Sequence, residues 1–108
     1  MIQHENLPEP FNKPKIEDQL QAVCQKNGIV FMAMFGSFAR GEQKRTSDVD
    51  LAIKFQKNSK KTLFDLVNLE YEMKKVFKRK IDIGLFRSIN KHVVGQVKKE
   101  MKVIYEER

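Results

Sequence analysis

The run Ile29–Phe35 constrains the fold most, because it contains no polar side chain. Such a run predicts a strand that is buried on both faces of a sheet. Gly36 follows directly, and glycine lets the backbone turn sharply and approach a ligand closely. Ser37 is a favoured N-cap residue, so we expect a short helix over residues 38–40 whose first unpaired N–H groups attract phosphate.

A second strand is predicted over Val49–Phe55, where apolar side chains alternate with polar or small ones. Alternation places Asp48 and Asp50 on the same face of this strand. A phosphate-binding turn facing two parallel carboxylates suits metal-assisted nucleotidyl transfer, because Mg²⁺ is usually held by one or two carboxylates together with substrate phosphates. On spacing alone, an ordinary turn and an ordinary strand start are equally good interpretations.

Three more helices and a terminal strand are predicted from caps and periodicity. Pro14 opens a helix that ends at the C-cap pair Asn27-Gly28. Residues 62–65 have the spacing of a capping box, and a helix of about four turns follows, ending in basic residues that complement the helix dipole. Ser88 caps a last helix, before a short strand over Val103–Tyr105. The apolar positions of the three helices are Ile16, Leu20 and Val23; Leu63, Leu66, Val67, Met73, Val76 and Phe77; and Ile89, Val93, Val97 and Met101.

A further strand is predicted at Lys80–Phe86, where apolar residues alternate with Asp82 and Gly84. A carboxylate in an otherwise apolar strand is costly unless it has a metal or a partner. On the residues alone, an exposed edge-strand aspartate, or one paired with a lysine, is a somewhat better interpretation of Asp82.

The order of these elements predicts an α/β (α+β) domain with a small mixed sheet and helices mainly on one face. Residues 1–12 hold two prolines and no sustained period, so we expect an irregular lead-in, followed by a single domain over residues 13–108. A single cysteine, Cys24, excludes an internal disulfide and is expected in the core. No stretch resembles a signal peptide or a membrane span, so cytoplasm is expected.

The net charge of +7 and the pI near 9.6 raise the question of nucleic-acid binding. The lysines are spread along the chain without an aromatic stripe or a nucleic-acid-binding module. A solvated basic face accounts for most of them, and an acidic partner or the triphosphate of ATP could account for the rest.

Gly36-Ser37, ten intervening residues and then Asp48-Val49-Asp50, together with Ala39-Arg40-Gly41, resemble the minimal nucleotidyltransferase (MNT) family of the DNA polymerase β-like superfamily. The resemblance runs from about residue 16 to residue 105. It implies a polymerase β-like palm and a transfer of AMP that depends on ATP and Mg²⁺. Many small members of the family are antitoxins encoded beside a HEPN-domain toxin.

The resemblance also implies roles for the acidic residues. Asp48 and Asp50 would hold two Mg²⁺ ions, and Asp82 matches the family's third carboxylate. Asp82 would bind the catalytic ion and help to deprotonate the attacking hydroxyl. These three are the expected catalytic and metal-binding residues.

Nucleotide binding is expected at the turn. Gly36 and Ser37 would bind the β and γ phosphates through backbone N–H groups and the hydroxyl. Arg40 could reach the triphosphate, and a salt bridge from Arg40 to Asp48 or Glu42 is an equally good interpretation.

The predicted function is therefore the transfer of AMP from ATP to a hydroxyl of a protein partner, which the resemblance identifies as a HEPN toxin. Two alternatives remain open. One is a non-catalytic antitoxin that neutralises its partner by binding alone. The other is nucleotide addition to nucleic-acid ends, which the basic charge favours and the lack of a nucleic-acid-binding domain opposes.

Overall fold

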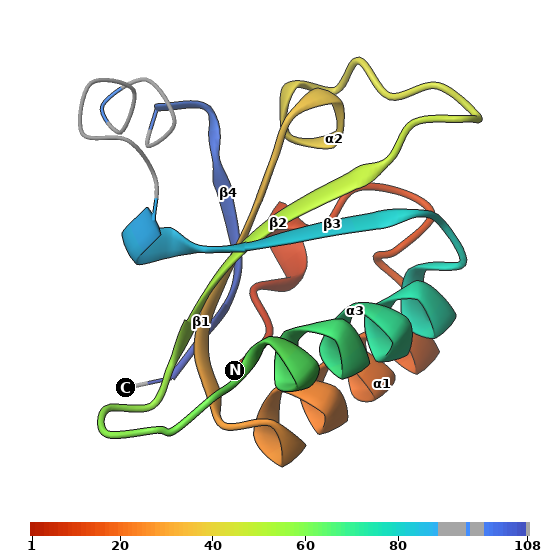
Figure 1. The fold of residues 1–108 in the computed structure, drawn as a ribbon. Helices are drawn as coiled ribbons and strands as arrows, with labels where there is room; N and C mark the ends of the chain where they lie inside the picture. Colours follow the sequence, from red (N-terminus) through yellow and green to blue (C-terminus); the bar gives the residue numbers. More distant parts are fainter. Residues whose placement is uncertain (89–94, 96–98, 108) are drawn as a thin grey trace.

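A four-stranded mixed sheet forms the centre of the computed structural model, which describes residues 1–88, 95 and 99–107 (Figure 1). The strands lie in the order β3-β2-β1-β4. The bounds of the strands and main helices are α1 (Pro14–Lys26), β1 (Ile29–Phe35), α2 (Ser37–Arg40), β2 (Val49–Phe55), α3 (Leu63–Phe77), β3 (Ile81–Leu85) and β4 (Lys102–Glu106). The mixed α/β architecture predicted from the sequence is confirmed.

The apolar run Ile29–Phe35 forms β1, an inner strand of the sheet. It pairs antiparallel with β2 on one side and with β4 on the other, whereas β3 lies parallel to β2. A parallel neighbour requires a crossover connection, and α3 provides it between β2 and β3. The terminal strand β4 confirms the strand predicted over Val103–Tyr105.

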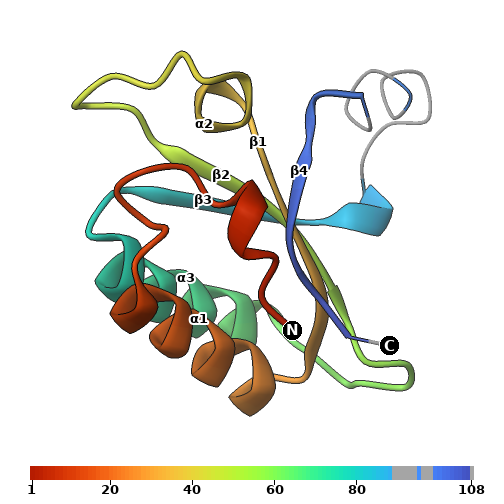
Figure 2. The same cartoon turned by 180° about the vertical axis from the view of Figure 1, so that it is seen from behind.

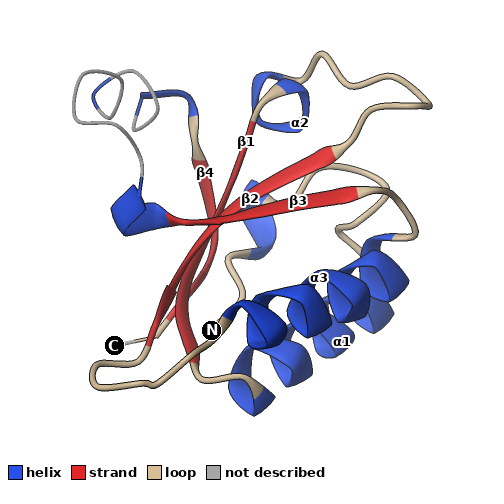
Figure 3. Ribbon diagram, in the orientation of Figure 1, coloured by secondary structure: helices blue, strands red, loops and turns tan. Residues whose placement is uncertain are grey.

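Helices α1 and α3 lie side by side and cover one face of the sheet (Figure 3). They contribute Leu20 and Cys24 from α1 and Leu69 and Met73 from α3, all of them at most 1% exposed. The sheet contributes alternate residues that face the helices, namely Met32, Met34, Val49, Leu51 and Ile53. The opposite face of the sheet is therefore free to carry polar groups.

The capping box at the start of α3 is confirmed, since the Thr62 and Asp65 side chains each accept a hydrogen bond from the other residue's backbone N–H. Part of the predicted apolar stripe is wrong. Leu63 and Val67 are 79% and 65% exposed. They stand four residues apart on an exposed face of the helix. Leu66, Leu69 and Met73 instead form the face that packs inward.

The N-terminal lead-in is irregular apart from one 3₁₀ turn, His4–Asn6. It nevertheless runs beside β4, where Ile2 forms an isolated bridge with Tyr105 (Figure 2). Leu7 and Phe11 are buried in the core. The segment therefore supplies core side chains that its lack of period did not predict.

The predicted last helix cannot be compared in full, because Ile89, Val93 and Val97 lie outside the described residues. Within the part of the chain that is described, no helix is both long and apolar enough to cross a membrane.

Candidate active site

The turn after β1 is made by Gly36, whose φ is +77°. An L side chain rarely adopts this conformation, so glycine is favoured here. Gly36 occupies the N-cap position of α2, and Ser37 is the first residue of the helix. The prediction that Ser37 is the N-cap is therefore wrong by one residue. The reason is that the chain turns at the glycine itself, and no side chain caps the helix.

Gly36 lies directly against Asp50. A Cβ atom built on Gly36 would stand 2.3 Å from Oδ2 of Asp50, which is closer than real Cβ atoms approach. The strand register explains the proximity, because Phe35 pairs with Asp50 across β1 and β2. The bare glycine therefore lets the turn after β1 and the carboxylate share one small space.

Asp82 lies beside Asp50 on the neighbouring strand, since the two residues are direct partners in the parallel register of β2 and β3. Asp48 precedes β2 by one residue, and its charge acts on Asp50. Asp50 is half-buried, whereas Asp48 and Asp82 are exposed. The edge strand β3 thus places Asp82 where solvent or a second molecule can reach it.

The charges at this end of the sheet act on each other. Burial raises the pKa of Asp50, and the negative charges of Asp82 and Asp48 raise it further, while Arg40 opposes them. Like charges held close together disfavour ionisation. The site therefore favours the approach of a cation.

The Arg40 side chain forms ion pairs with carboxylates other than Asp48, Asp50 and Asp82. Its Nε donates a hydrogen bond to Oε2 of Glu42 at 3.1 Å, and its Nη1 lies 3.7 Å from Oε2 of Glu100. Of the two salt-bridge partners considered from the sequence, the structure shows Glu42. Arg40 is half-exposed, so these are weak surface pairs that a stronger anion could replace.

The sequence profile described as "Polymerase beta, Nucleotidyltransferase" matches residues 18–108, most of the chain. The chain belongs to this nucleotidyltransferase family. A protein of Methanocaldococcus jannaschii, named as a proposed protein adenylyltransferase, is 36% identical over 80 residues, which make up 74% of this chain and 84% of that protein.

Two solved structures show the same nucleotidyltransferase fold. One, described as a proposed minimal nucleotidyltransferase, is 31% identical with a TM-score of 0.66, covering 81% of this chain and 86% of that chain. The other is a chain from the complex of a tri-AMPylated HEPN toxin of Shewanella oneidensis with an MNT antitoxin. It is 16% identical with a TM-score of 0.62, covering 86% of this chain and 71% of that chain. At that identity the second likeness supports the fold alone.

A metal ion in this nucleotidyltransferase would need ligands beyond the protein. Among residues 1–88, 95 and 99–107, no three acidic, histidine or cysteine side chains gather closely enough to hold an ion by themselves. Paired carboxylates are nevertheless the protein ligands that Mg²⁺ commonly uses, with substrate phosphates completing its octahedron. Asp48, Asp50 and Asp82 fit that chemistry, since they offer oxygen ligands whose negative charges act on one another and are only partly offset by Arg40.

The sequence did not predict how the nucleotidyltransferase holds the loop before Asp48. Nη1 of Arg79 donates a hydrogen bond to the Arg45 carbonyl oxygen at 2.7 Å, and the guanidinium lies 5.2 Å from the Phe38 ring centroid. The backbone N–H of Lys44 donates to Oγ of Ser47 at 2.7 Å. From the sequence, Arg79 was predicted only as one of the basic residues at the end of a helix. No sequence pattern indicated a contact with a loop more than 30 residues earlier.

Proposed function

We propose that this protein transfers AMP from ATP to a hydroxyl of a protein partner in the cytoplasm, and that the partner is a HEPN-domain toxin. The family supports the reaction class. The name of the archaeal relative supports a protein acceptor, and the solved complex of an AMPylated HEPN toxin with an MNT antitoxin supports the HEPN partner. In this role the protein is an antitoxin that acts by covalent modification.

The contact between Gly36 and Asp50 carries the proposal. The turn that we propose to bind phosphate therefore lies beside a carboxylate on which two further carboxylates act. An aspartate cluster without such a turn beside it could bind a cation but could not also hold the phosphates of a nucleotide. This arrangement suits a triphosphate that arrives with its cations.

The proposed reaction is an in-line displacement at the α-phosphorus of ATP. The acceptor oxygen forms a bond to the α-phosphorus, the bond from that phosphorus to the oxygen bridging to the β-phosphate breaks, and pyrophosphate leaves. Backbone N–H groups of Gly36 and Ser37, with the Ser37 hydroxyl, hold the β and γ phosphates. Arg40 exchanges its surface pair with Glu42 for the triphosphate.

Asp82 receives the proton of the acceptor hydroxyl, because it is exposed on the edge strand and next to Asp50. Its exposure lets a hydroxyl carried by a separate protein reach it. Two Mg²⁺ ions, held by Asp48, Asp50 and Asp82 together with the phosphates, would supply charge neutralisation for the attacking and leaving oxygens.

The proposal is tested by incubating the protein and a purified HEPN partner with ATP labelled at the α-phosphate. Label should move to the partner with the wild type and be lost with Asp48→Asn and with Asp50→Asn. Asp18→Asn is the matched control, because Asp18 is an exposed aspartate on α1, and this helix covers the face of the sheet opposite the carboxylates. Equal labelling by all variants would contradict the assignment, and neutralisation of the toxin without labelling would favour the non-catalytic alternative. Label on nucleic acid instead of protein would favour end addition.

A further inference from the structure

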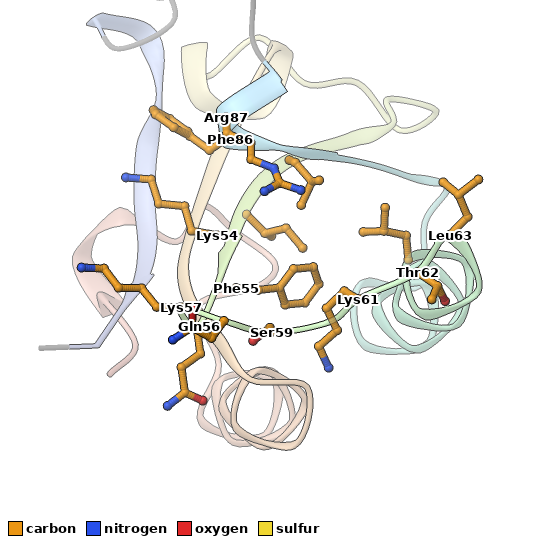
Figure 4. Close-up of a pocket in the computed structure, with 14 residues that line it drawn as sticks. Lys54, Phe55, Gln56, Lys57, Ser59, Lys61, Thr62, Leu63, Phe86 and Arg87 are labelled. Atoms are coloured by element: carbon orange, nitrogen blue, oxygen red, sulfur yellow. The ribbon is translucent and has the colours of Figure 1, made fainter.

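A cavity of about 530 Å³ opens at the opposite end of β2 from the carboxylates (Figure 4). It lies between the end of β2, the end of β3 and the loop that leads into α3. Phe55 lies five positions after Asp50 along the strand, which is about 17 Å at roughly 3.3 Å per residue. The cavity is therefore separate from the proposed nucleotide site.

The cavity is apolar inside and basic at its rim. Ile53, Phe55, Leu66 and Leu85 provide apolar walls, and the ring of Phe55 points into the space. Every charged residue of the lining is a lysine or an arginine, and no aspartate or glutamate contributes to it among the described residues. Uncharged polar residues and two further apolar ones complete the lining, namely Gln56, Asn58, Ser59, Thr62, Leu63 and Phe86. A cavity of this kind suits an apolar side chain that arrives with negative charge around it.

Two of the cations lie close to the apolar walls. Figure 4 shows Arg87 pointing into the cavity above Phe55, while Lys54 and Lys57 point away from it. Nζ of Lys61 lies 5.3 Å from the Phe55 ring centroid. Within the described residues, neither Lys61 nor Arg87 forms an ion pair with a carboxylate of this chain. Both can therefore pair with carboxylates of another molecule.

The cavity continues into an exposed apolar stripe on α3. Leu63 lines the cavity and is also exposed. Val67 and Tyr71 follow it at intervals of four residues, and Phe64 beside them is 81% exposed. Residues at this spacing share one face of a helix. The stripe ends at a further cation, since Nζ of Lys75 lies 4.6 Å from the Tyr71 ring centroid.

We propose that this cavity and the α3 stripe together dock an acidic segment of a protein partner that carries bulky apolar side chains. One apolar side chain enters the cavity against Phe55, others cover the stripe, and carboxylates pair with Lys61, Arg87 and Lys75. Adjacent exposed apolar side chains typically mark interaction sites on soluble proteins. The net charge of +7 favours the approach of an acidic partner from a distance.

A protein segment fits this surface better than a nucleic acid does. A nucleic acid binds mainly through phosphates and needs cations along its whole track. Here the middle of the surface consists of the exposed apolar side chains of Leu63, Phe64, Val67 and Tyr71, and the cations described above lie at its two ends. An acidic amphipathic segment matches both features.

The test uses the whole protein and fluorescence anisotropy with short labelled peptides, and it needs neither ATP nor an active site. The first peptide combines glutamate with leucine and phenylalanine, and the second has the same charge with serine in place of the apolar residues. We expect the first peptide to bind at least about tenfold more tightly than the second. Lys61→Glu/Arg87→Glu and Leu63→Ser should each weaken its binding by a similar factor.

Lys15→Glu is the matched control, because Lys15 is exposed on α1 and does not line the cavity, and it should leave the affinity within about twofold. The substituted side chains are all exposed, so unchanged melting temperatures should accompany the losses. Equal affinity for both peptides, or an unchanged affinity in the Lys61, Arg87 and Leu63 variants, would overturn the proposal. It would also be overturned if oligothymidylate of equal charge bound more tightly and displaced the peptide.

Discussion

Gly36 and Asp50 approach so closely that residue 36 has no room for a side chain, because a Cβ atom there would stand 2.3 Å from Oδ2 of Asp50. Gly36→Ala should therefore displace the carboxylate as well as strain the backbone. We expect AMP transfer to fall about 100-fold, the scale on which a small displacement of a catalytic group acts. The measurement is the rate of label transfer from ATP.

Gly28→Ala is the control for backbone strain. Gly28 also has a positive φ, +68°, but its nearest neighbouring atom, in Gln56, would be 4.0 Å from an added Cβ. Gly28→Ala should lose about 1–2 kcal/mol of stability, the cost of an L side chain at a positive φ. Gly36→Ala should lose more, because its ψ of −152° lies in a region that is essentially open to glycine alone and the added Cβ would meet Asp50. Only Gly36→Ala should lose activity, and an equal loss in both variants would mean that backbone strain alone is responsible.

Asp50 should reduce the stability of the protein when no nucleotide is bound. Burial and the charges of Asp82 and Asp48 raise its pKa in the folded state, so the ionised carboxylate disfavours folding at neutral pH. Asp50→Asn should therefore raise the melting temperature near pH 7. The gain should shrink as the pH falls toward about 4, where the carboxyl also becomes protonated in the unfolded chain.

The wild type and Asp50→Asn should also differ in how ATP with Mg²⁺ changes their melting temperatures. ATP with Mg²⁺ should raise the melting temperature of the wild type, because a ligand that binds only the folded state stabilises it. Asp50→Asn should lose most of this increment. If Asp50→Asn instead melted at a lower temperature than the wild type at neutral pH, burial and the charges of Asp82 and Asp48 would not destabilise the ionised Asp50 as we expect.

The N-terminal segment should be essential for stability. Phe11 is 1% exposed, and its ring centroid lies 5.3 Å from that of Phe38 and 4.8 Å from that of Phe77. Phe11→Ala should cost about 3–5 kcal/mol of unfolding free energy in a denaturant titration. Phe64→Ala, the same change at an exposed position, should stay within about 0.5 kcal/mol. Similar losses in the two variants would refute the position of Phe11 in the core.

Cys24 should be unreactive in the folded protein. Burial raises the pKa of its thiol to about 12, and the thiolate is the reactive form. At about pH 8, iodoacetamide should leave the native protein unmodified and should alkylate it in guanidinium chloride. Rapid alkylation of the native protein would show that the thiol is accessible.

The sequence predicted those parts of the fold that depend on local patterns. The apolar run of β1, the capping box at Thr62 and the alternation around Asp50 each follow from periodicity or from a cap, and the structure contains all three. The proximity of Gly36 and Asp82 to Asp50 was expected from the family resemblance. The spacing alone left an ordinary turn and an edge-strand aspartate as alternatives.

Features that depend on packing between distant segments could not be predicted. Phe11 lies in a segment whose few apolar residues have no period, and its ring packs against Phe38 and Phe77 from distant parts of the chain. The exposure of Val67 depends on which side of α3 meets the sheet, and the broad apolar pattern of that helix did not determine it. The link from Arg79 to the loop before Asp48 joins residues more than 30 positions apart.

The most direct test of the central claim is the intact mass of a HEPN partner after co-expression with the wild type and with Asp48→Asn. We predict mass increments of about 329 Da, one for each AMP transferred, with the wild type only. An unmodified partner in both samples, together with neutralised toxicity, would contradict transfer of AMP as the mechanism of this protein.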